Sequence, residues 1–277
     1  MKFMYITNQP QIAKAALRAN VDILFVDMEY IGKDKRQKGM DTVQNHHTFD
    51  DIRTIRKVID GFNKKNASLL VRVNPIHNNS KSEIEEAIQS GADIIMLPMW
   101  KTLDEVKKFV TIINGRAKAY LLLENKEAAK IIDDVLNVFG IDGIYIGLND
   151  LHLSYENKFM FEPLANGTVD LLAQKINEKK LDFGFGGIAK LREGTLPAEK
   201  ILAEHIRLNS QMVILSRKFC SITDVDRITE IEECFMEGIG DIKKEEQRLK
   251  QMDNTFLAKN QQEVKELVRQ IVKRMTV

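Results

Sequence analysis

Cysteine is scarce in this chain of 277 residues, which contains only Cys220 and Cys234. Two cysteines are too few for a disulfide framework, and they lack the paired spacing of a zinc site. Such low usage fits a reducing compartment, where structural disulfides rarely form. The sequence therefore predicts a cytoplasmic protein.

Long apolar runs and an excess of charge of one sign are also missing. No stretch approaches the roughly eighteen apolar residues that a membrane-spanning helix needs, and the first segment turns polar after a few positions. Lys and Arg number 41 against 40 Asp and Glu, so there is no net field to attract nucleic acid or an anionic bilayer. We therefore expect neither nucleic acid nor membrane as a partner.

The sequence does contain a regular alternation of short apolar runs with longer amphipathic segments. Segments such as 82–89, 103–114 and 127–139 have helical period and are followed closely by glycine, which commonly ends a helix. This alternation is typical of βαβ units and a parallel sheet. The eight candidate strands begin at Phe3, Ile23, Leu69, Ile94, Ala119, Gly143, Phe183 and Met212.

Eight such units predict a (β/α)8 TIM barrel, since strands that read as continuous apolar runs are buried on both faces. An open, doubly wound sheet is the alternative. We assign the barrel to residues 1–240 and a C-terminal helical extension to residues 241–277. The extension packs on its own barrel or on a neighbouring subunit. Its last helix carries one apolar stripe, formed by Val264, Leu267, Val268, Ile271, Val272 and Met275.

Polar residues at the C-terminal ends of the strands are the candidates for function, because active sites of such barrels lie at that face. They come from the second, third, fifth, sixth and eighth strands. The residues are Asp27, Glu29, Arg72, Asn74, Glu124, Asn149, Asp150, Ser216 and Arg217.

Glu124 and Asp150 end two neighbouring strands after apolar runs. A carboxylate buried there is costly unless a cation offsets it. Mg²⁺ and Mn²⁺ are commonly held by one or two carboxylates, with water and substrate oxygens completing the shell. The pair therefore predicts a divalent metal site, and the alternative is that each acid pairs with a lysine or caps the next helix.

Arg72 stands between Val71 and Val73 in an apolar strand, so we expect its guanidinium to point into the barrel mouth. Arginine binds carboxylates in a bidentate manner, and beside a metal it would also stabilise an enolate oxygen. Asp27, Glu29, Asn74 and Arg217 are the further candidates for substrate binding. The alternative for Arg72 is a structural salt bridge to Asp27 or Glu29.

The runs ILFVDMEY, LLVRVNP, SGADIIMLPM, LLLEN and GIDGIYIGLNDLHLS, in this order, resemble the HpcH/HpaI aldolase and citrate lyase β-subunit family. The resemblance implies a metal-dependent barrel in which Glu124 and Asp150 bind Mg²⁺, Mn²⁺ or a similar ion. It further implies that Arg72 binds the carboxylate and developing enolate of pyruvate or a related acid. Homo-oligomers, trimers or hexamers, built partly through C-terminal helices are implied as well.

The chain departs from the family at one position of the second strand end. Aldolases of the family have an acidic residue followed by a histidine that transfers protons, whereas Glu29 is followed here by Tyr30. His46 and His47 lie at the end of the long connection that follows, just before Thr48 and Asp51, which have capping-box spacing. We hypothesise that one of the two histidines supplies the missing base; otherwise both are solvated loop residues.

Three functions remain open from the sequence. The first is a metal-dependent carbon–carbon lyase of the aldolase type, which acts on a 2-oxo acid such as pyruvate or oxaloacetate through a stabilised enolate. The second is a lyase of the citrate lyase β type that acts on a CoA thioester. The third is a barrel that binds a ligand but is catalytically altered.

Overall fold

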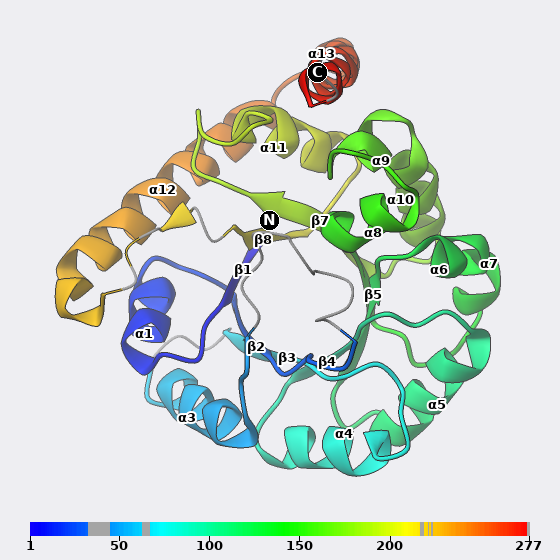
Figure 1. Cartoon of the computed structure of the whole chain (residues 1–277). Coiled ribbons are helices and arrows are strands. Elements are labelled where there is room, and N and C mark those ends of the chain that lie inside the picture. The colour runs from blue at the N-terminus through cyan, green and yellow to red at the C-terminus, as the bar shows by residue number, and fades with distance from the viewer. Residues whose placement is uncertain (33–44, 63–66, 217–218, 221, 223, 276–277) are drawn as a thin grey trace.

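The computed structural model describes residues 1–32, 45–62, 67–216, 219–220, 222 and 224–275. Eight parallel strands close into a barrel in the order of the sequence, which confirms the predicted (β/α)8 architecture (Figure 1). The strands are β1 (Lys2–Ile6), β2 (Ile23–Asp27), β3 (Ser68–Arg72), β4 (Ile94–Leu97), β5 (Lys118–Leu123), β6 (Gly143–Ile146), β7 (Asp182–Ile188) and β8 (Met212–Leu215).

Helices surround the barrel on its outer side (Figure 1). They are α1 (Pro10–Arg18), α3 (Phe49–Asp60), α4 (Ser80–Gln89), α5 (Leu103–Ile113), α6 (Lys126–Lys130), α7 (Ile132–Val135), α8 (Leu148–Ser154), α9 (Glu162–Ala165), α10 (Thr168–Glu178), α11 (Ala198–Arg207), α12 (Ile228–Leu249) and α13 (Asn254–Arg274). A short 3₁₀ turn, η2 (Val225–Arg227), precedes α12. None of the helices described is long and apolar enough to cross a membrane.

Alternate residues of each strand fill the inside of the barrel, as the two-residue period of a strand requires. Two large ones, Tyr120 and Tyr145, are accommodated by glycine on adjacent strands. A Cβ at Gly143 would lie 2.8 Å from the Tyr120 ring, and one at Gly184 would lie 2.6 Å from the Tyr145 ring. The interior cluster consists of Met4, Ile23, Phe25, Leu70, Ile94, Met96, Tyr120, Leu122, Tyr145 and Met212.

A repeated hydrogen bond stabilises the N-terminal end of the barrel. The residue immediately before each even-numbered strand accepts a hydrogen bond from a backbone N–H of the preceding odd-numbered strand, so adjacent strands are fixed in register. The four bonds are Phe3 N to Asp22 Oδ2 at 3.0 Å, Leu69 N to Asp93 Oδ2 at 2.7 Å, Ala119 N to Asp142 Oδ2 at 2.8 Å and Phe183 N to Gln211 Oε1 at 2.8 Å. This end therefore supports the fold and leaves the opposite end for chemistry.

Helix α3 begins where the sequence predicts. Thr48 is its N-cap, and the reciprocal bonds between Thr48 and Asp51 form the predicted capping box. A second capping box, between Thr102 and Glu105, starts α5. Because the α3 cap fixes the chain at Thr48, it also places residues 45–47 at the C-terminal end of the barrel.

The C-terminal extension packs on the barrel of its own chain in this structure. Helix α13 lies against α11 and α9, outside the ring of helices (Figure 1). The Asn260 amide donates to the Oε1 atom of Glu204, which is fully buried, at 2.8 Å. The predicted boundary between residues 240 and 241 falls inside α12, which continues unbroken to Leu249 and packs on α1 and α11.

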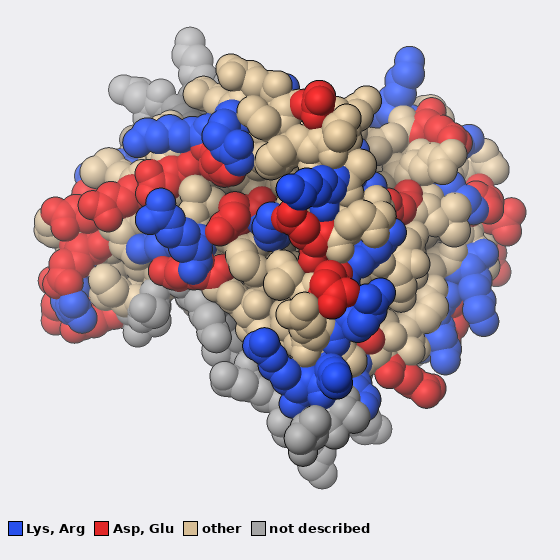
Figure 2. All heavy atoms as spheres, turned by 90° about the horizontal axis from the view of Figure 1, so that it is seen from above, with Lys and Arg blue, Asp and Glu red and all other residues tan. Residues whose placement is uncertain are grey.

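Charged side chains of both signs are interspersed over the face drawn in Figure 2. This mixture is what the near balance of 41 basic and 40 acidic residues leads one to expect. The absence of a nucleic-acid partner stays a prediction.

Candidate active site

Three strands each carry a charged residue at the inward-facing position just above the apolar interior. Phe25 in β2, Leu70 in β3 and Leu122 in β5 belong to the barrel interior. Two residues further along the chain come Asp27, Arg72 and Glu124, of which Asp27 and Arg72 end their strands and Glu124 immediately follows β5. The strand period turns these side chains into the barrel mouth, and Asp27 and Arg72 are partners in the parallel register of β2 and β3.

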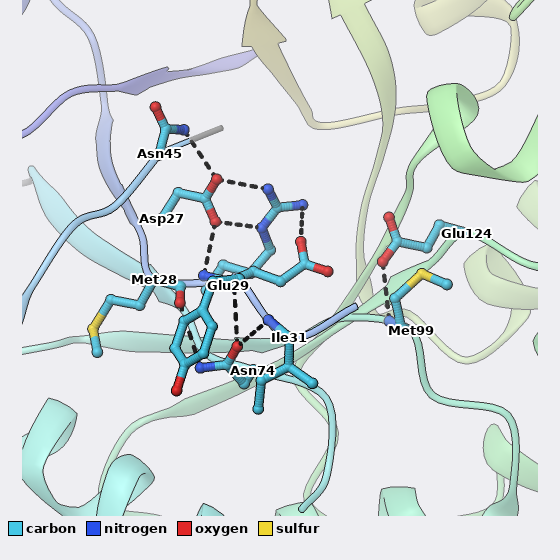
Figure 3. A network of polar contacts seen from close by, with 10 residues as sticks. Asp27, Met28, Glu29, Ile31, Asn45, Asn74, Met99 and Glu124 are labelled. Carbon is cyan, nitrogen blue, oxygen red and sulfur yellow. Dashed lines mark hydrogen bonds and ion pairs between the residues drawn. The ribbon is translucent and has the colours of Figure 1, made fainter. Parts of the chain in front are cut away.

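Arg72 makes ion pairs with both acids of the β2 end. Its Nε and Nη2 atoms donate to the two carboxylate oxygens of Asp27, each at 2.8 Å, and Nη1 lies 3.3 Å from Glu29 Oε2 (Figure 3). The guanidinium also lies over the Phe25 ring, 5.7 Å from its centroid. Burial alone would lower the pKa of Arg72, but Asp27 and Glu29 raise it well above its usual value. Arg72 therefore occupies the mouth and forms the salt bridges of the alternative interpretation as well.

The Arg72 guanidinium keeps donor capacity beyond these ion pairs. It has five N–H groups, and the contacts with Asp27 and Glu29 use three of them, one each on Nε, Nη1 and Nη2. One hydrogen on each terminal nitrogen is left over by this count. A substrate carboxylate or carbonyl oxygen could be bound there while Asp27 and Glu29 fix the direction of the fork.

Glu124 is buried, with 2% of its surface exposed, and accepts one hydrogen bond from the backbone N–H of Met99 at 3.0 Å (Figure 3). Its pKa is raised well above the usual carboxyl value. Burial is the largest cause, followed by the charges of Asp150 and Glu29, and Arg72 opposes them. Asp150 lies in the first turn of α8, directly after β6. The two predicted metal ligands are therefore close enough for their charges to repel each other.

A glycine leaves space for this carboxylate. A Cβ built at Gly147, the residue after β6, would lie 3.1 Å from Glu124 Cβ and 3.2 Å from Glu124 Oε2. At these distances the Glu124 side chain would have to move by a few tenths of an ångström. The backbone of β6 thus approaches the carboxylate as closely as a residue without a side chain allows.

These features fit a divalent cation. Within the part of the chain that the structure describes, no three or more His, Cys, Asp or Glu side chains are grouped as a metal-ligand set. Two carboxylates completed by water and substrate oxygens are nevertheless a common arrangement for Mg²⁺. The repulsion that raises the Glu124 pKa is the kind of electrostatic cost that a bound cation relieves.

Asn74 lies just beyond β3 and is buried, with 2% of its surface exposed. Its Oδ1 accepts the backbone N–H groups of Tyr30 at 3.0 Å and Ile31 at 2.9 Å, and its Nδ2 donates to Glu83 Oε1 at 2.6 Å. Both ends of the amide are therefore engaged by the protein, and Figure 3 shows the contacts of Asn74 with the chain after β2. Its predicted role in substrate binding stays a prediction.

The two histidines of the hypothesis have different environments. His46 is exposed, whereas His47 is half-buried and its Nδ1 accepts the backbone N–H of Asp27 at 3.0 Å. Asn45 donates to Asp27 Oδ2 at 3.0 Å, so this segment covers the end of β2. Because Nδ1 of His47 is an acceptor, the neutral ring carries its proton on Nε2.

Among the remaining candidates, Asn149 lies in the first turn of α8, Ser216 directly follows β8, and Arg217 lies outside the described residues. Sequence reasoning missed Glu83 in α4, which accepts hydrogen bonds from both the backbone and the side chain of Asn74. An acid in the first turn of a helix is common for reasons of helix stability, so Glu83 carried no distinguishing signal. It also missed the Met99 amide, because a backbone group leaves no trace in residue identity.

Comparison with known proteins gives a family and a fold. The model of the HpcH/HpaI aldolase/citrate lyase family matches residues 2–159. No match was found among curated proteins. The solved structures described next are 13% to 16% identical to this chain, so their similarity supports the fold alone.

A HpcH/HpaI aldolase/citrate lyase family protein from Burkholderia cenocepacia J2315 has a TM-score of 0.61 at 13% identity, covering 78% of this chain and 87% of its own. The HpcH/HpaI aldolase from Desulfitobacterium hafniense DCB-2 has a TM-score of 0.59 at 16% identity, covering 87% and 92%. The citrate synthase SbnG has a TM-score of 0.59 at 15% identity, covering 87% and 94%.

Proposed function

Because the chain belongs to the HpcH/HpaI aldolase/citrate lyase family, we propose that it is a divalent-metal-dependent carbon–carbon lyase acting on a 2-oxo acid such as pyruvate or oxaloacetate. Membership indicates an enzyme of the lyase type, and the metal and the substrate class are the proposal. The observation that carries it is the buried Glu124, whose pKa is raised by burial and by Asp150, across the mouth from Arg72.

Glu124 and Asp150 would hold the metal, Mg²⁺ or Mn²⁺. When bound, such an ion supplies electrostatic stabilisation to an enolate oxygen. Met99 fixes Oε1 of Glu124 through its N–H, which orients the carboxylate. Gly147 leaves the space that this orientation needs.

Arg72 would bind the 2-oxo acid through the N–H groups that remain beyond its contacts with Asp27 and Glu29. Because those two acids fix the guanidinium in place, little side-chain entropy is lost when substrate binds. Negative charge that develops on the substrate oxygen during enolate formation strengthens its hydrogen bonds to the guanidinium. Arg72 thereby favours the enolate over the bound keto acid.

In the proposed mechanism His47 would act as a hydrogen-bond donor. With Nδ1 engaged by the Asp27 N–H, the neutral ring has no lone pair left to accept a proton. The hypothesis that a histidine replaces the family's base is therefore modified: in this conformation His47 would polarise a carbonyl oxygen through its Nε2–H. In this mechanism another group or a water molecule at the mouth would accept the proton during enolate formation.

The test is exchange of the pyruvate methyl protons in D₂O, followed by NMR. We expect exchange with Mg²⁺ or Mn²⁺, loss of exchange in EDTA, and a fall of at least about 100-fold in Glu124→Gln and Asp150→Asn, as for removal of a main electrostatic element. Asp134→Asn is the matched control, since Asp134 is exposed on α7. Its exchange rate should equal that of the wild type.

Other outcomes would favour the alternatives. Exchange at the methyl group of acetyl-CoA, with none at pyruvate, would support the CoA-thioester lyase. Binding of oxalate, which mimics the enolate, with no exchange at either substrate would support a catalytically altered, ligand-binding barrel. Metal-independent exchange that survives both carboxylate substitutions would contradict the metal site.

A further inference from the structure

Glu83 receives three hydrogen bonds at the start of α4. Its Oε1 accepts the backbone N–H of Asn74 at 3.2 Å and the Asn74 Nδ2–H at 2.6 Å. Its Oε2 lies 2.9 Å from His77 Nε2. The Nδ1 atom of His77 accepts the backbone N–H of Asn79 at 3.2 Å, so the proton of the neutral ring is on Nε2 and points at Glu83.

Asn74, which Glu83 holds in place, in turn binds the chain after β2. Its side chain accepts from the N–H groups of Tyr30 and Ile31 and approaches the Met28 carbonyl at 3.4 Å. Two consecutive N–H groups converging on one oxygen fix the direction in which the backbone leaves the strand (Figure 3). The segment held in this way, residues 28–31, includes Glu29.

Glu29 connects the segment to Arg72. Its carboxylate is 3.3 Å from Nη1 of Arg72, and its side chain is almost fully buried. A shift of the backbone at residue 29 would therefore change the ion pair between Glu29 and Nη1 of Arg72. Catalytic geometry tolerates such shifts poorly, since displacements near 1 Å can cost about 100-fold in rate.

We propose that Glu83 is a positioning residue for Arg72, acting through Asn74 and Glu29, and that its ionised carboxylate sets the orientation in which Arg72 meets the 2-oxo acid. The inference rests on the proposed function. Residues that orient a catalytic group in this way affect activity through that group without touching the substrate.

The chemistry of the cluster explains why a carboxylate is needed. Three donors converge on Glu83, and an ionised carboxylate accepts on both oxygens. A glutamine at this position would have to turn its NH₂ group toward Asn74 or toward His77 Nε2–H. In either orientation a donor faces a donor, and one hydrogen bond of the clamp is lost.

The experiment uses Glu83→Gln, with Glu85→Gln on the same helix as the control. Glu85 is half-exposed and lies 4.0 Å from Arg116, away from the mouth. We expect Glu83→Gln to lower the exchange rate and weaken oxalate binding in the presence of Mg²⁺ by about tenfold each, which corresponds to about 1.4 kcal/mol. Glu85→Gln should change neither.

A double-mutant cycle distinguishes positioning from a general structural role. If Glu83 acts through Arg72, Glu83→Gln should change the oxalate dissociation constant less than about twofold in an Arg72→Lys background. Multiplicative effects of the two substitutions would overturn the inference, as would normal exchange and binding in a folded Glu83→Gln variant.

The double variant Glu83→Gln/His77→Ala should recover most of the loss, because removal of the ring donor lets the amide oxygen face Asn74. If the double variant recovers nothing, the loss in Glu83→Gln does not come from two donors facing each other.

Two safeguards keep the outcomes separate. If Glu83→Gln fails to fold, His77→Ala alone removes one donor and should produce a smaller loss of exchange, roughly threefold; unchanged exchange there overturns the inference. If the wild type itself exchanges no pyruvate protons, the proposed function fails. Exchange in the wild type with no effect of Glu83 means that only the inference fails.

Discussion

Replacement of Glu124 by glutamine should stabilise the metal-free protein, and increasingly so as the pH rises. The pKa of Glu124 in the folded state is raised well above its ordinary value of 4.5, chiefly by burial and then by the charges of Asp150 and Glu29. The folded state therefore holds this proton more tightly than the unfolded chain. Stability is lost as pH rises from the ordinary carboxyl pKa to the raised one, because folding then requires a buried, repelled charge.

The glutamine variant does not pay this penalty, since it has the same shape without the titration. Its amide oxygen can still accept from the Met99 N–H, and its NH₂ group can face Asp150. The stability difference between Glu124→Gln and the wild type should be small near pH 4.5 and widen by up to about 1.4 kcal/mol per pH unit through the window. For a chain of this size that is roughly 3 °C in Tm per pH unit.

The assay is thermal or urea unfolding in EDTA from pH 5 to pH 8. Parallel stability curves for the two proteins would refute the reasoning, because they would mean that Glu124 titrates alike in both states. Asp134→Asn should run parallel to the wild type. Addition of Mg²⁺ or Mn²⁺ should reverse the order: the wild type gains stability as the metal replaces the proton, and Glu124→Gln does not.

Substitutions at three further positions test other parts of the site and fold. Gly147→Ala should cost about 1–3 kcal/mol of unfolding free energy and weaken Mg²⁺ binding, measured by calorimetry, because its Cβ would press on Glu124. His47→Gln should retain carbon–carbon bond formation from pyruvate and a short aldehyde within about tenfold, whereas His47→Ala loses more; equal loss in both would indicate a general base. Asn260→Ala should cost about 2 kcal/mol and expose α13 to limited proteolysis, because Glu204 loses a buried hydrogen bond; unchanged protection would refute the anchoring role.

The fold followed from the sequence because each level of evidence agreed. Eight apolar runs, the helical segments between them and their glycine stops all indicated the same parallel architecture, and every predicted strand is present. The features that were not predicted depend on contacts between distant segments. Asp142 and Asp182 look alike in the sequence, yet only the structure assigns Asp142 to the N–H of Ala119.

Two rules predict part of the candidate site: functional residues lie at the C-terminal ends of the strands, and alternate strand residues point into the barrel. Both rules select Asp27, Arg72 and Glu124, and the register places the first two side by side. They could not show that Asn74 is engaged by the loop after β2, or that His47 and not His46 reaches the end of β2. Those outcomes depend on how a connection folds back, which no local pattern of residues specifies.

Tyr30 stands where the family resemblance implies a histidine, and the structure indicates what that change can affect. Asn74 holds the backbone N–H of Tyr30, and a main-chain bond does not depend on the side chain that residue 30 carries. Glu29 and Arg72 can thus keep their arrangement while the group presented at the mouth changes, and Tyr30 is 60% exposed there. In the proposed mechanism enolate formation depends on Arg72, Glu124 and Asp150, so it should be separable from the later step in which the partner carbonyl is bound. The divergence of this chain from its family is expected in that later step: Tyr30→His should change the choice of aldehyde while leaving pyruvate proton exchange within a few-fold of the wild type, and a loss of exchange in that variant would contradict the separation.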